Sequence, residues 1–190
     1  MNNTASSKAL GFGIFAVVTW MMSMPDAGWF VPAAYGTGTA HAVLVFGMIG
    51  LLIAAIAAFV RGDTWFAFFF MFWSAVAWGL SSHMGGPSVV PAFAGWLWLA
   101  FGLVNLYLWI AAMQGGLGGA ISLTVLLTAL SIIATGIHGF VHTSILVRID
   151  GYLGLAAAVV AFYVSATEII NSSAGRNVLP FGAGARSGGM

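Results

Sequence analysis

Six long apolar stretches, separated by short polar segments, make up most of the chain. They run approximately over residues 9–24, 39–60, 64–84, 92–113, 118–137 and 151–170. A membrane-spanning helix needs about 20 apolar residues, because each residue adds about 1.5 Å against a hydrocarbon core about 30 Å thick. The stretches are continuous and do not alternate as the strands of a membrane β-barrel do. The sequence therefore predicts an all-α polytopic membrane protein with six transmembrane helices.

The segments between these stretches are too short to form a soluble domain. We expect an N-terminal tail over 1–8, one six-helix transmembrane domain over 9–172 and a cytoplasmic tail over 173–190. The Gly/Ser-rich part of that tail, 182–190, is expected to be disordered. The first stretch has no Ala-x-Ala cleavage site at its end, so we expect it to be retained rather than removed as a signal peptide.

The composition agrees with lipid as the solvent. Only 5% of the 190 residues are charged and 61% are hydrophobic. The formal net charge of +1 and the absence of a basic patch exclude nucleic acid as an expected partner. The chain has no cysteine, so it has neither a disulfide nor a thiolate metal site. We expect a multi-pass protein of the inner (plasma) membrane, in contact with the lipid bilayer.

The few basic residues predict the orientation. With six crossings, four of them fall on one side (Lys8, Arg61, Arg176 and Arg186), whereas Arg148 falls on the other. Cytoplasmic loops carry an excess of Lys and Arg. Both termini are therefore predicted to be cytoplasmic.

Small residues gather in the second and sixth stretches: Ala54, Ala55, Ala57 and Ala58, and Gly151, Gly154, Ala156, Ala157, Ala158 and Ala161. Such faces let helix backbones approach closely, within a protomer or between protomers. We expect them to mediate a cyclic homo-oligomer.

Polar residues inside the membrane are sparse, and each is a candidate functional group. Glu168, near the cytoplasmic end of the last stretch, is interpreted as an interfacial carboxylate paired with Arg176 or Lys8, or as a substrate or proton group at the pore exit. Asn105 would form an interhelical hydrogen bond or line the pore.

Two histidines, His138 and His142, have the i, i+4 spacing that places two side chains on one helical face. They could bind a metal, form a pH-responsive mouth or be ordinary interfacial residues, which is the interpretation we favour. His41 and His83 carry less signal. We expect no metal and no cofactor.

No enzyme motif is present. We find no Ser or Cys nucleophile with an adjacent base, no paired carboxylates and no phosphate-binding loop. The Gly-x-Gly at Gly11 lies inside an apolar stretch and indicates packing. We therefore do not expect an enzyme.

The most specific sequence motifs lie near the end of the chain: Gly151-Tyr152-Leu153-Gly154-Leu155, then Glu168 and Asn171, then Gly175-Arg176-Asn177-Val178-Leu179-Pro180-Phe181-Gly182. Further pieces are Leu10-Gly11-Phe12, Ala27-Gly28-Trp29-Phe30, Gly62-Asp63-Thr64 and Ser122-Leu123-Thr124-Val125-Leu126. In this order and spacing, residues 10 to 182 resemble the acetate uptake transporter family, which includes the bacterial succinate–acetate permeases.

The resemblance implies a homohexamer of six-helix protomers, each with its own pore for acetate and related small carboxylates. It implies a hydrophobic constriction at Phe15, Trp73 and Leu123, where Trp73 takes the place of a tyrosine. These three residues lie on helices that are predicted to run outward. Their depths, counted from the cytoplasmic start of each helix, agree within about 6 Å. Phe15 and Trp73 could instead face lipid. The path residues implied by the motifs are Leu10, Gly11, Thr124 and Asn171, beside the polar candidates Asn105 and Glu168.

The chain also departs from the family pattern. Ser6-Ser7-Lys8-Ala9 replaces Asn-Pro-Ala-Pro, Leu51 falls where the family has Gln, and Ile133 and Ile137 replace Asn residues. This predicts a less polar pore, for which succinate is a poorer substrate.

We expect a channel, or a proton-coupled transporter, for acetate and similar monocarboxylates. The alternatives are a channel for a neutral solute (urea, an amide or ammonia) and a non-transporting membrane scaffold or sensor.

Overall fold

The computed structural model describes residues 6–30, 37–83 and 91–180. Arg186, most of the predicted N-terminal tail and the Gly/Ser-rich segment 182–190 lie outside the described residues.

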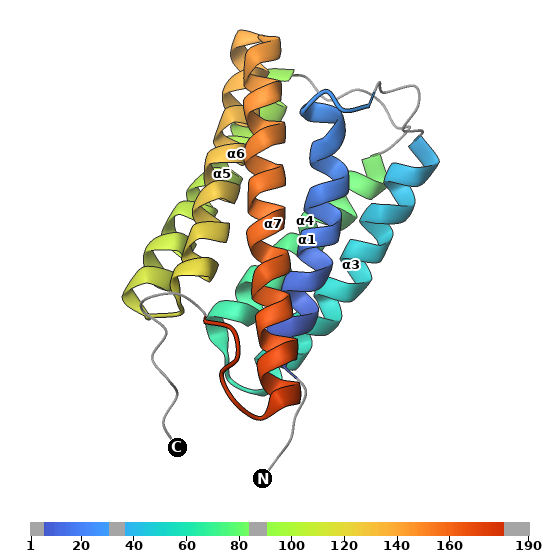
Figure 1. Ribbon diagram of the computed structural model, residues 1–190. Coiled ribbons are helices and arrows are strands. Elements are labelled where there is room, and N and C mark those ends of the chain that lie inside the picture. The colour runs from blue at the N-terminus through green and yellow to red at the C-terminus, as the bar shows by residue number, and fades with distance from the viewer. Residues whose placement is uncertain (1–5, 31–36, 84–90, 181–190) are drawn as a thin grey trace.

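Six helices make up the described structure: α1 (Ser7–Asp26), α3 (Thr37–Val60), α4 (Thr64–His83), α5 (Pro91–Gln114), α6 (Gly119–Val141) and α7 (Ser144–Ala174) (Figure 1). All six are long and apolar enough to cross a membrane. The described residues contain no strand. The prediction of an all-α protein with six transmembrane helices is confirmed.

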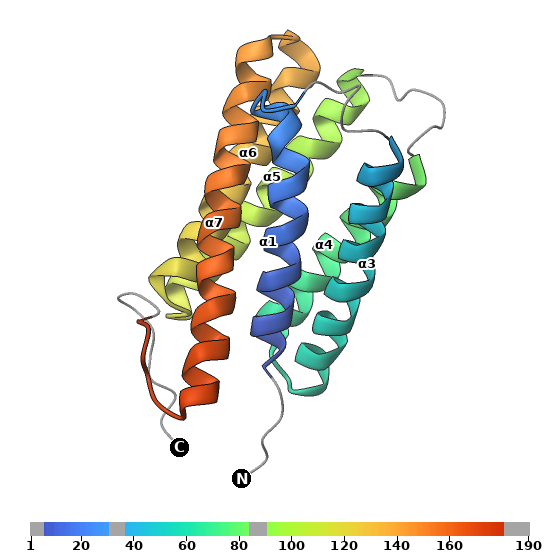
Figure 2. The ribbon, with the colours of Figure 1, turned by 45° about the vertical axis from the view of Figure 1, so that its right-hand side comes forward.

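The helices form a ring that follows chain order and closes where α7 packs on α1 (Figure 2). The tightest neighbours are α1 with α7 and α5 with α6, followed by α3 with α4 and α6 with α7. The ring is weakest between α4 and α5, which barely touch. The bundle is thus two tightly packed groups of helices joined through α1 and α7.

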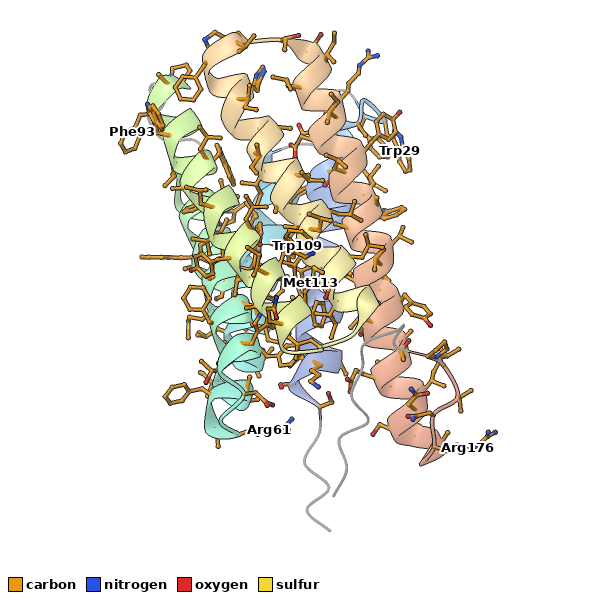
Figure 3. All side chains as sticks on the ribbon, turned by 90° about the vertical axis from the view of Figure 1, so that its left-hand side faces the viewer. Trp29, Arg61, Phe93, Trp109, Met113 and Arg176 are labelled. Carbon is orange, nitrogen blue, oxygen red and sulfur yellow. The ribbon has the colours of Figure 1, made fainter. Side chains whose placement is uncertain are left out.

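The basic residues divide between the two ends of the bundle. α1 begins near Lys8, α3 and α4 join at Arg61 and α7 ends before Arg176, all at one end, which we call the Lys8 end. Figure 3 shows Arg61 and Arg176 at this end, and Trp29 and Phe93 near the opposite one. Arg148 lies in the first turns of α7, at the opposite end, which we call the Arg148 end.

The sequence placed residues 138–150 outside the last two helices, and this boundary was wrong. α6 continues to Val141, and α7 begins at Ser144, where the Thr143 side chain accepts a hydrogen bond from the Ile145 N–H (3.4 Å). The 31 residues of α7 span about 46 Å, which exceeds a hydrocarbon core of about 30 Å. A helix can therefore carry Arg148 and Asp150 beyond the most apolar region without ending there.

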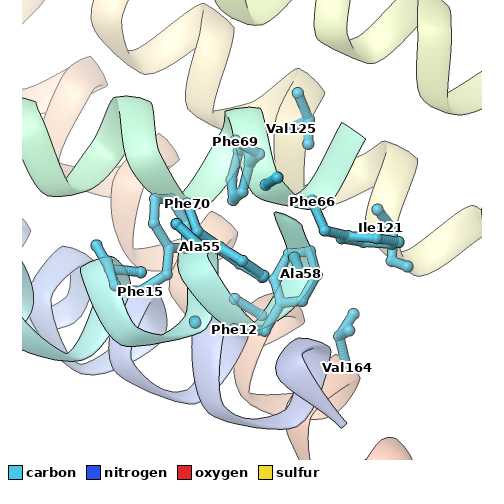
Figure 4. Packing of buried hydrophobic residues seen from close by; sticks show 14 of the residues in the cluster. Phe12, Phe15, Ala55, Ala58, Phe66, Phe69, Phe70, Ile121, Val125 and Val164 are labelled. Carbon is cyan, nitrogen blue, oxygen red and sulfur yellow. The ribbon is translucent and has the colours of Figure 1, made fainter. Parts of the chain in front are cut away.

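Aromatic rings fill the half of the bundle nearest the Lys8 end. Phe12, Phe15, Phe69 and Phe70 are each at most 1% exposed, and Phe66 packs against them (Figure 4). The ring centroids of Phe12 and Phe69 lie 5.7 Å apart and those of Phe12 and Phe70 5.4 Å apart. These separations are typical of attractive aromatic pairs. We call this group the phenylalanine cluster.

The small residues act mainly inside the protomer. Six of the alanines in these stretches are less than 2% exposed: Ala54, Ala55, Ala58, Ala157, Ala158 and Ala161. At Gly151 an added Cβ would lie 2.1 Å from the backbone nitrogen of Ala27, so α7 and α1 are in backbone contact there. The expectation that these faces join protomers was wrong for most of their residues, because the bundle itself has already buried them.

The last described residues fold back along α7. The helix ends at Gly175, which has φ +63°, and the chain then returns past Asn171. The Asn171 amide donates to the Leu179 carbonyl (2.8 Å) and accepts from the Val178 and Leu179 N–H groups (2.8 and 2.9 Å). The Tyr163 hydroxyl donates to the Pro180 carbonyl (2.6 Å). Asn171 therefore fixes the tail to the helix.

We predict that Gly151→Ala destabilises the protein, because the Ala27 backbone cannot move away from a new methyl group as a flexible side chain could. Overpacking of this kind costs about 1–3 kcal/mol. Gly79→Ala is the matched control, since its Cβ would meet no heavy atom within 4 Å. Thermal melting of the two purified variants in detergent checks this. A Gly151→Ala melting temperature equal to that of Gly79→Ala would contradict it.

We predict that Asn171→Ala releases residues 176–180 from α7, because three hydrogen bonds end on this one side chain. Limited proteolysis should cut the variant near Arg176 faster than the wild type. Asn177→Ala is the control, since this neighbouring exposed residue makes none of those three bonds. Equal cleavage rates for the two variants would contradict the prediction.

Candidate functional site

A cavity of about 240 Å³ lies inside the ring of helices, and all six helices contribute to its wall. We call it the outer cavity. On α1 its lining runs from Phe15 to Asp26, which at 1.5 Å per residue is a length of about 16 Å. It extends from the middle of the bundle toward the Arg148 end. Three further recesses in the described part of the chain differ from it, because each is lined by one helix or by two neighbouring ones.

The floor of the outer cavity is aromatic and aliphatic. Phe15 and Trp73 meet there edge to face, with ring centroids 5.2 Å apart. Leu51 lines the same cavity and is 1% exposed, so the leucine found where the resemblance implies Gln is part of the wall. Below the floor, the ring centroid of Phe69 lies 5.3 Å from that of Phe15, and both residues belong to the phenylalanine cluster. The phenylalanine cluster, with the aliphatic side chains packed around it, therefore lies between the cavity and the Lys8 end.

One polar atom interrupts this apolar floor. The indole Nε1 of Trp73 is buried and has no hydrogen-bond partner among the described residues. An unpaired buried donor is costly, at about 1–3 kcal/mol. Trp73 therefore carries a buried donor that the described residues leave unpaired.

The mouth of the outer cavity is polar. Asp26 ends α1 and Asp150 lies in α7, and both carboxylates line the cavity. The Ser131 hydroxyl, on α6, donates to the Asp150 carboxylate and also lies 3.3 Å from the Asp150 carbonyl. Thr128 and Thr135 add hydroxyls to the same wall. The cavity thus changes along its length from acidic and hydroxylic to aromatic.

His138 stands beside the mouth and interacts electrostatically with both carboxylates. Its Nδ1 lies 3.1 Å from the Thr143 carbonyl oxygen, and its ring centroid lies 6.1 Å from that of His142. His142 caps α6 with φ 53°. Within the described residues no group of three or more His, Cys, Asp or Glu is arranged to hold a metal ion. His41 lies elsewhere, where its Nδ1 is 3.0 Å from the Ser81 hydroxyl.

The three residues of the expected constriction are not all together. Phe15 and Trp73 are in contact, but Leu123 is 45% exposed on α6. Leu123 belongs neither to the lining of the outer cavity nor to the phenylalanine cluster. Its neighbour Thr124 is fully buried instead. The assumption that equal depth brings the three residues into one ring did not account for the direction of each side chain around its helix.

The expected path residues near the start of α1 and α6 do not line the outer cavity. Leu10 is 40% exposed. Gly11 is covered by the Phe70 ring, which an added Cβ would meet at 2.2 Å. The Thr124 hydroxyl donates to the Ala120 carbonyl of its own helix (2.9 Å). Their roles in a path stay predictions.

The remaining candidates make local contacts. The Asn105 amide donates to the Phe101 carbonyl (2.9 Å), while its Oδ1 is buried with no hydrogen-bond partner in the described chain. Glu168 accepts from the Ser6 hydroxyl (2.9 Å), which ties the start of α1 to α7. Asn171 holds the tail and does not line the outer cavity. None of the three reaches the mouth or the floor.

Asp26 and Asp150 are the residues that sequence reasoning missed. The sequence contains only four Asp and Glu residues in total. Two of these four, Asp26 and Asp150, fall on the same predicted side of the membrane. That shared side was the signal in the sequence that could have pointed to a common site. Both lie just outside the predicted apolar stretches, Asp26 after 9–24 and Asp150 before 151–170. The structure places both of them in helices and in one cavity wall.

Comparisons with known proteins agree on the fold. No protein-family model matches the chain. An uncharacterized protein of Methanothermobacter thermautotrophicus (strain Delta H) is 27% identical over 196 residues, which cover 94% of this chain and 92% of the relative.

A solved structure described as the bacterial acetate channel SatP superimposes with a TM-score of 0.84. The match covers 95% of this chain and all of that one, at 18% sequence identity. The similarity shows that this chain shares the fold of that channel over 95% of its residues.

Proposed function

We propose that the chain is a multi-pass channel or transporter of the inner membrane that passes acetate and similar small monocarboxylic acids through the interior of each protomer. The outer cavity carries this proposal, because it is enclosed by all six helices and ends on an aromatic floor. The shared fold with a bacterial acetate channel and the residue resemblance in the sequence support it.

The basic residues at the two ends support an orientation for this path. Lys8, Arg61 and Arg176 gather at one end, which the positive-inside rule assigns to the cytoplasm. The outer cavity then opens away from the cytoplasm, at the Arg148 end. Solute entering it meets the acidic mouth first and the Phe15–Trp73 pair second.

Passage beyond the floor needs movement of aromatic rings. Phe12, Phe69 and Phe70 fill the space below Phe15 and are fully buried. An ionised carboxylate loses its water hydrogen bonds in such surroundings, and the burial of an unpaired charge is severely unfavourable. The neutral acid loses much less. We therefore favour passage of the protonated acid, or of the anion together with a proton.

A channel for a neutral solute such as urea is the second candidate. The described lining of the outer cavity contains no Lys or Arg to attract an anion. The hydroxyls of Ser131, Thr128 and Thr135 could bind an amide as well as a carboxylic acid. The acidic mouth suits an uncharged solute in either case.

The resemblance also implies a homohexamer. Since the small-residue faces are used inside the protomer, we propose that neighbouring protomers meet through exposed apolar surface such as that of α5. Six large side chains on α5 are at least 50% exposed: Phe93, Trp96, Leu103, Tyr107, Ile110 and Met113.

We predict that acetate flux into liposomes holding the purified protein is higher at pH 5 than at pH 8. Reference carboxyl pKa values near 4 mean that the neutral fraction falls about 1000-fold over this interval. The measurement is uptake of labelled acetate and labelled urea side by side, with empty liposomes subtracted. Urea flux without acetate flux would favour the neutral-solute channel. The absence of both would favour a scaffold or sensor.

We predict that Trp73→Ala raises acetate flux and admits propionate, because it removes the indole that meets Phe15 at the floor. An increase of about tenfold corresponds to a barrier lowered by about 1.4 kcal/mol. Trp78→Ala is the matched control, since Trp78 lies on the same helix, is 63% exposed and is outside the cavity lining.

Trp65 is not a suitable control for this experiment. Its indole donates to the Leu108 carbonyl (3.0 Å) and stacks on Phe69, so its truncation would disturb the packing of the bundle. Equal fluxes for Trp73→Ala and Trp78→Ala would contradict the proposed floor.

A further inference from the structure

The acidic mouth of the outer cavity is built by a close approach of two helices. An added Cβ on Gly151 would lie 2.1 Å from the Ala27 nitrogen and 2.5 Å from the Asp26 carbonyl carbon. The α7 backbone next to Asp150 therefore touches the α1 backbone at Asp26. Both side chains line the same cavity. The two carboxylates are neighbours because the helices leave no space for a side chain between them.

The groups that face this pair differ from helix to helix around the wall. α6 contributes the hydroxyls of Ser131 and Thr135 to the wall, and Ser131 donates to the Asp150 carboxylate. His138, also on α6 but outside the lining, interacts electrostatically with both carboxylates. The lining from α3, α4 and α5 is apolar or aromatic, without a charged group. Arg148 lines a separate surface recess with Ile145 and Tyr152. The described lining of the outer cavity contains no Lys, Arg or His.

A negative charge at this point discriminates between the two forms of a carboxylic acid. With an effective dielectric constant of about 20 and a separation of about 6 Å, a fixed unit charge changes the partition of a monovalent anion by about 100-fold. The neutral acid feels no such repulsion, and its hydroxyl can donate to a carboxylate oxygen. One ionised carboxylate is enough for the effect.

We propose that Asp26 and Asp150 are the specificity-determining residues of the path, which exclude carboxylate anions from the outer cavity and admit uncharged acids. This inference rests on the proposed function and adds the reason why the anion does not enter. It also applies to charge in general, since the same pair favours small cations over small anions at the mouth.

The test uses the full chain in liposomes, as wild type, Asp26→Asn, Asp150→Asn and the double variant. Three solutes of similar size are measured at pH 8, with empty liposomes subtracted: acetate as the anion, acetamide as the neutral solute and methylammonium as the cation. We expect the double variant to raise acetate flux about tenfold and to lower methylammonium flux. Acetamide flux should change less than twofold.

Asp63→Asn is the matched control, because Asp63 lies in the turn between α3 and α4, at the Lys8 end and outside the cavity lining. It should leave all three fluxes unchanged. If Asp150→Asn does not give a monodisperse protein, Asp26→Asn alone decides, with a smaller rise expected. Acetate flux at pH 8 that stays at the wild-type level in the double variant, while acetamide still passes, overturns the inference.

The outcome separates this inference from the proposed function. A wild type that passes acetamide and methylammonium, but no acetate at pH 5 or pH 8, contradicts the proposed function. In that case, acetate flux through the double variant would still support anion exclusion by the two carboxylates. If the double variant passes no acetate either, the inference is overturned together with the proposed function. A wild type that passes none of the three solutes overturns both.

Discussion

The close approach of α1 and α7 is the contact on which the rest of this structure depends. It closes the ring of helices, and it relies on Gly151 and Gly154, whose added Cβ atoms would lie 2.1 Å from Ala27 and from Ser23 on α1. In lipid, helices gain little from burying apolar surface, so close packing of small residues must supply their association. Any side chain at Gly151 would separate the helices and with them the two walls of the mouth.

The size of the side chains then decides where the ring is filled and where it is hollow. Near the Lys8 end, Phe12, Phe69 and Phe70 occupy the centre and leave no space. Toward the Arg148 end the inward residues are shorter, including Ser131 and Thr128, and the outer cavity remains between them. The weak seam between α4 and α5 adds to this, because Val76, Leu80 and Trp98 line both the cavity and an apolar groove on the outside.

The sequence predicted the helices well, because long apolar runs have one stable arrangement in a bilayer. It predicted the start of α7 poorly, since Arg148 and Asp150 were taken as loop residues although a helix longer than the hydrocarbon core can contain them. The contact of Phe15 with Trp73 followed from the resemblance. The position of Leu123 did not, because depth along a helix does not fix the direction around it. The pairing of Asp26 with Asp150 depends on α1 packing against α7, which no local pattern shows.

The two ends of the outer cavity place opposite demands on a solute, and only some species meet both. The mouth offers carboxylates and hydroxyls, which accept hydrogen bonds and repel negative charge. The floor offers aromatic faces, which cannot replace the hydration of an ion. A small cation is attracted at the mouth but loses hydration at the floor, so it passes more slowly than a neutral solute. A small anion is repelled at the mouth before it can reach the floor. A small uncharged molecule with a hydrogen-bond donor, such as a protonated carboxylic acid or an amide, can bind at the mouth through its donor and loses least when it enters the aromatic floor.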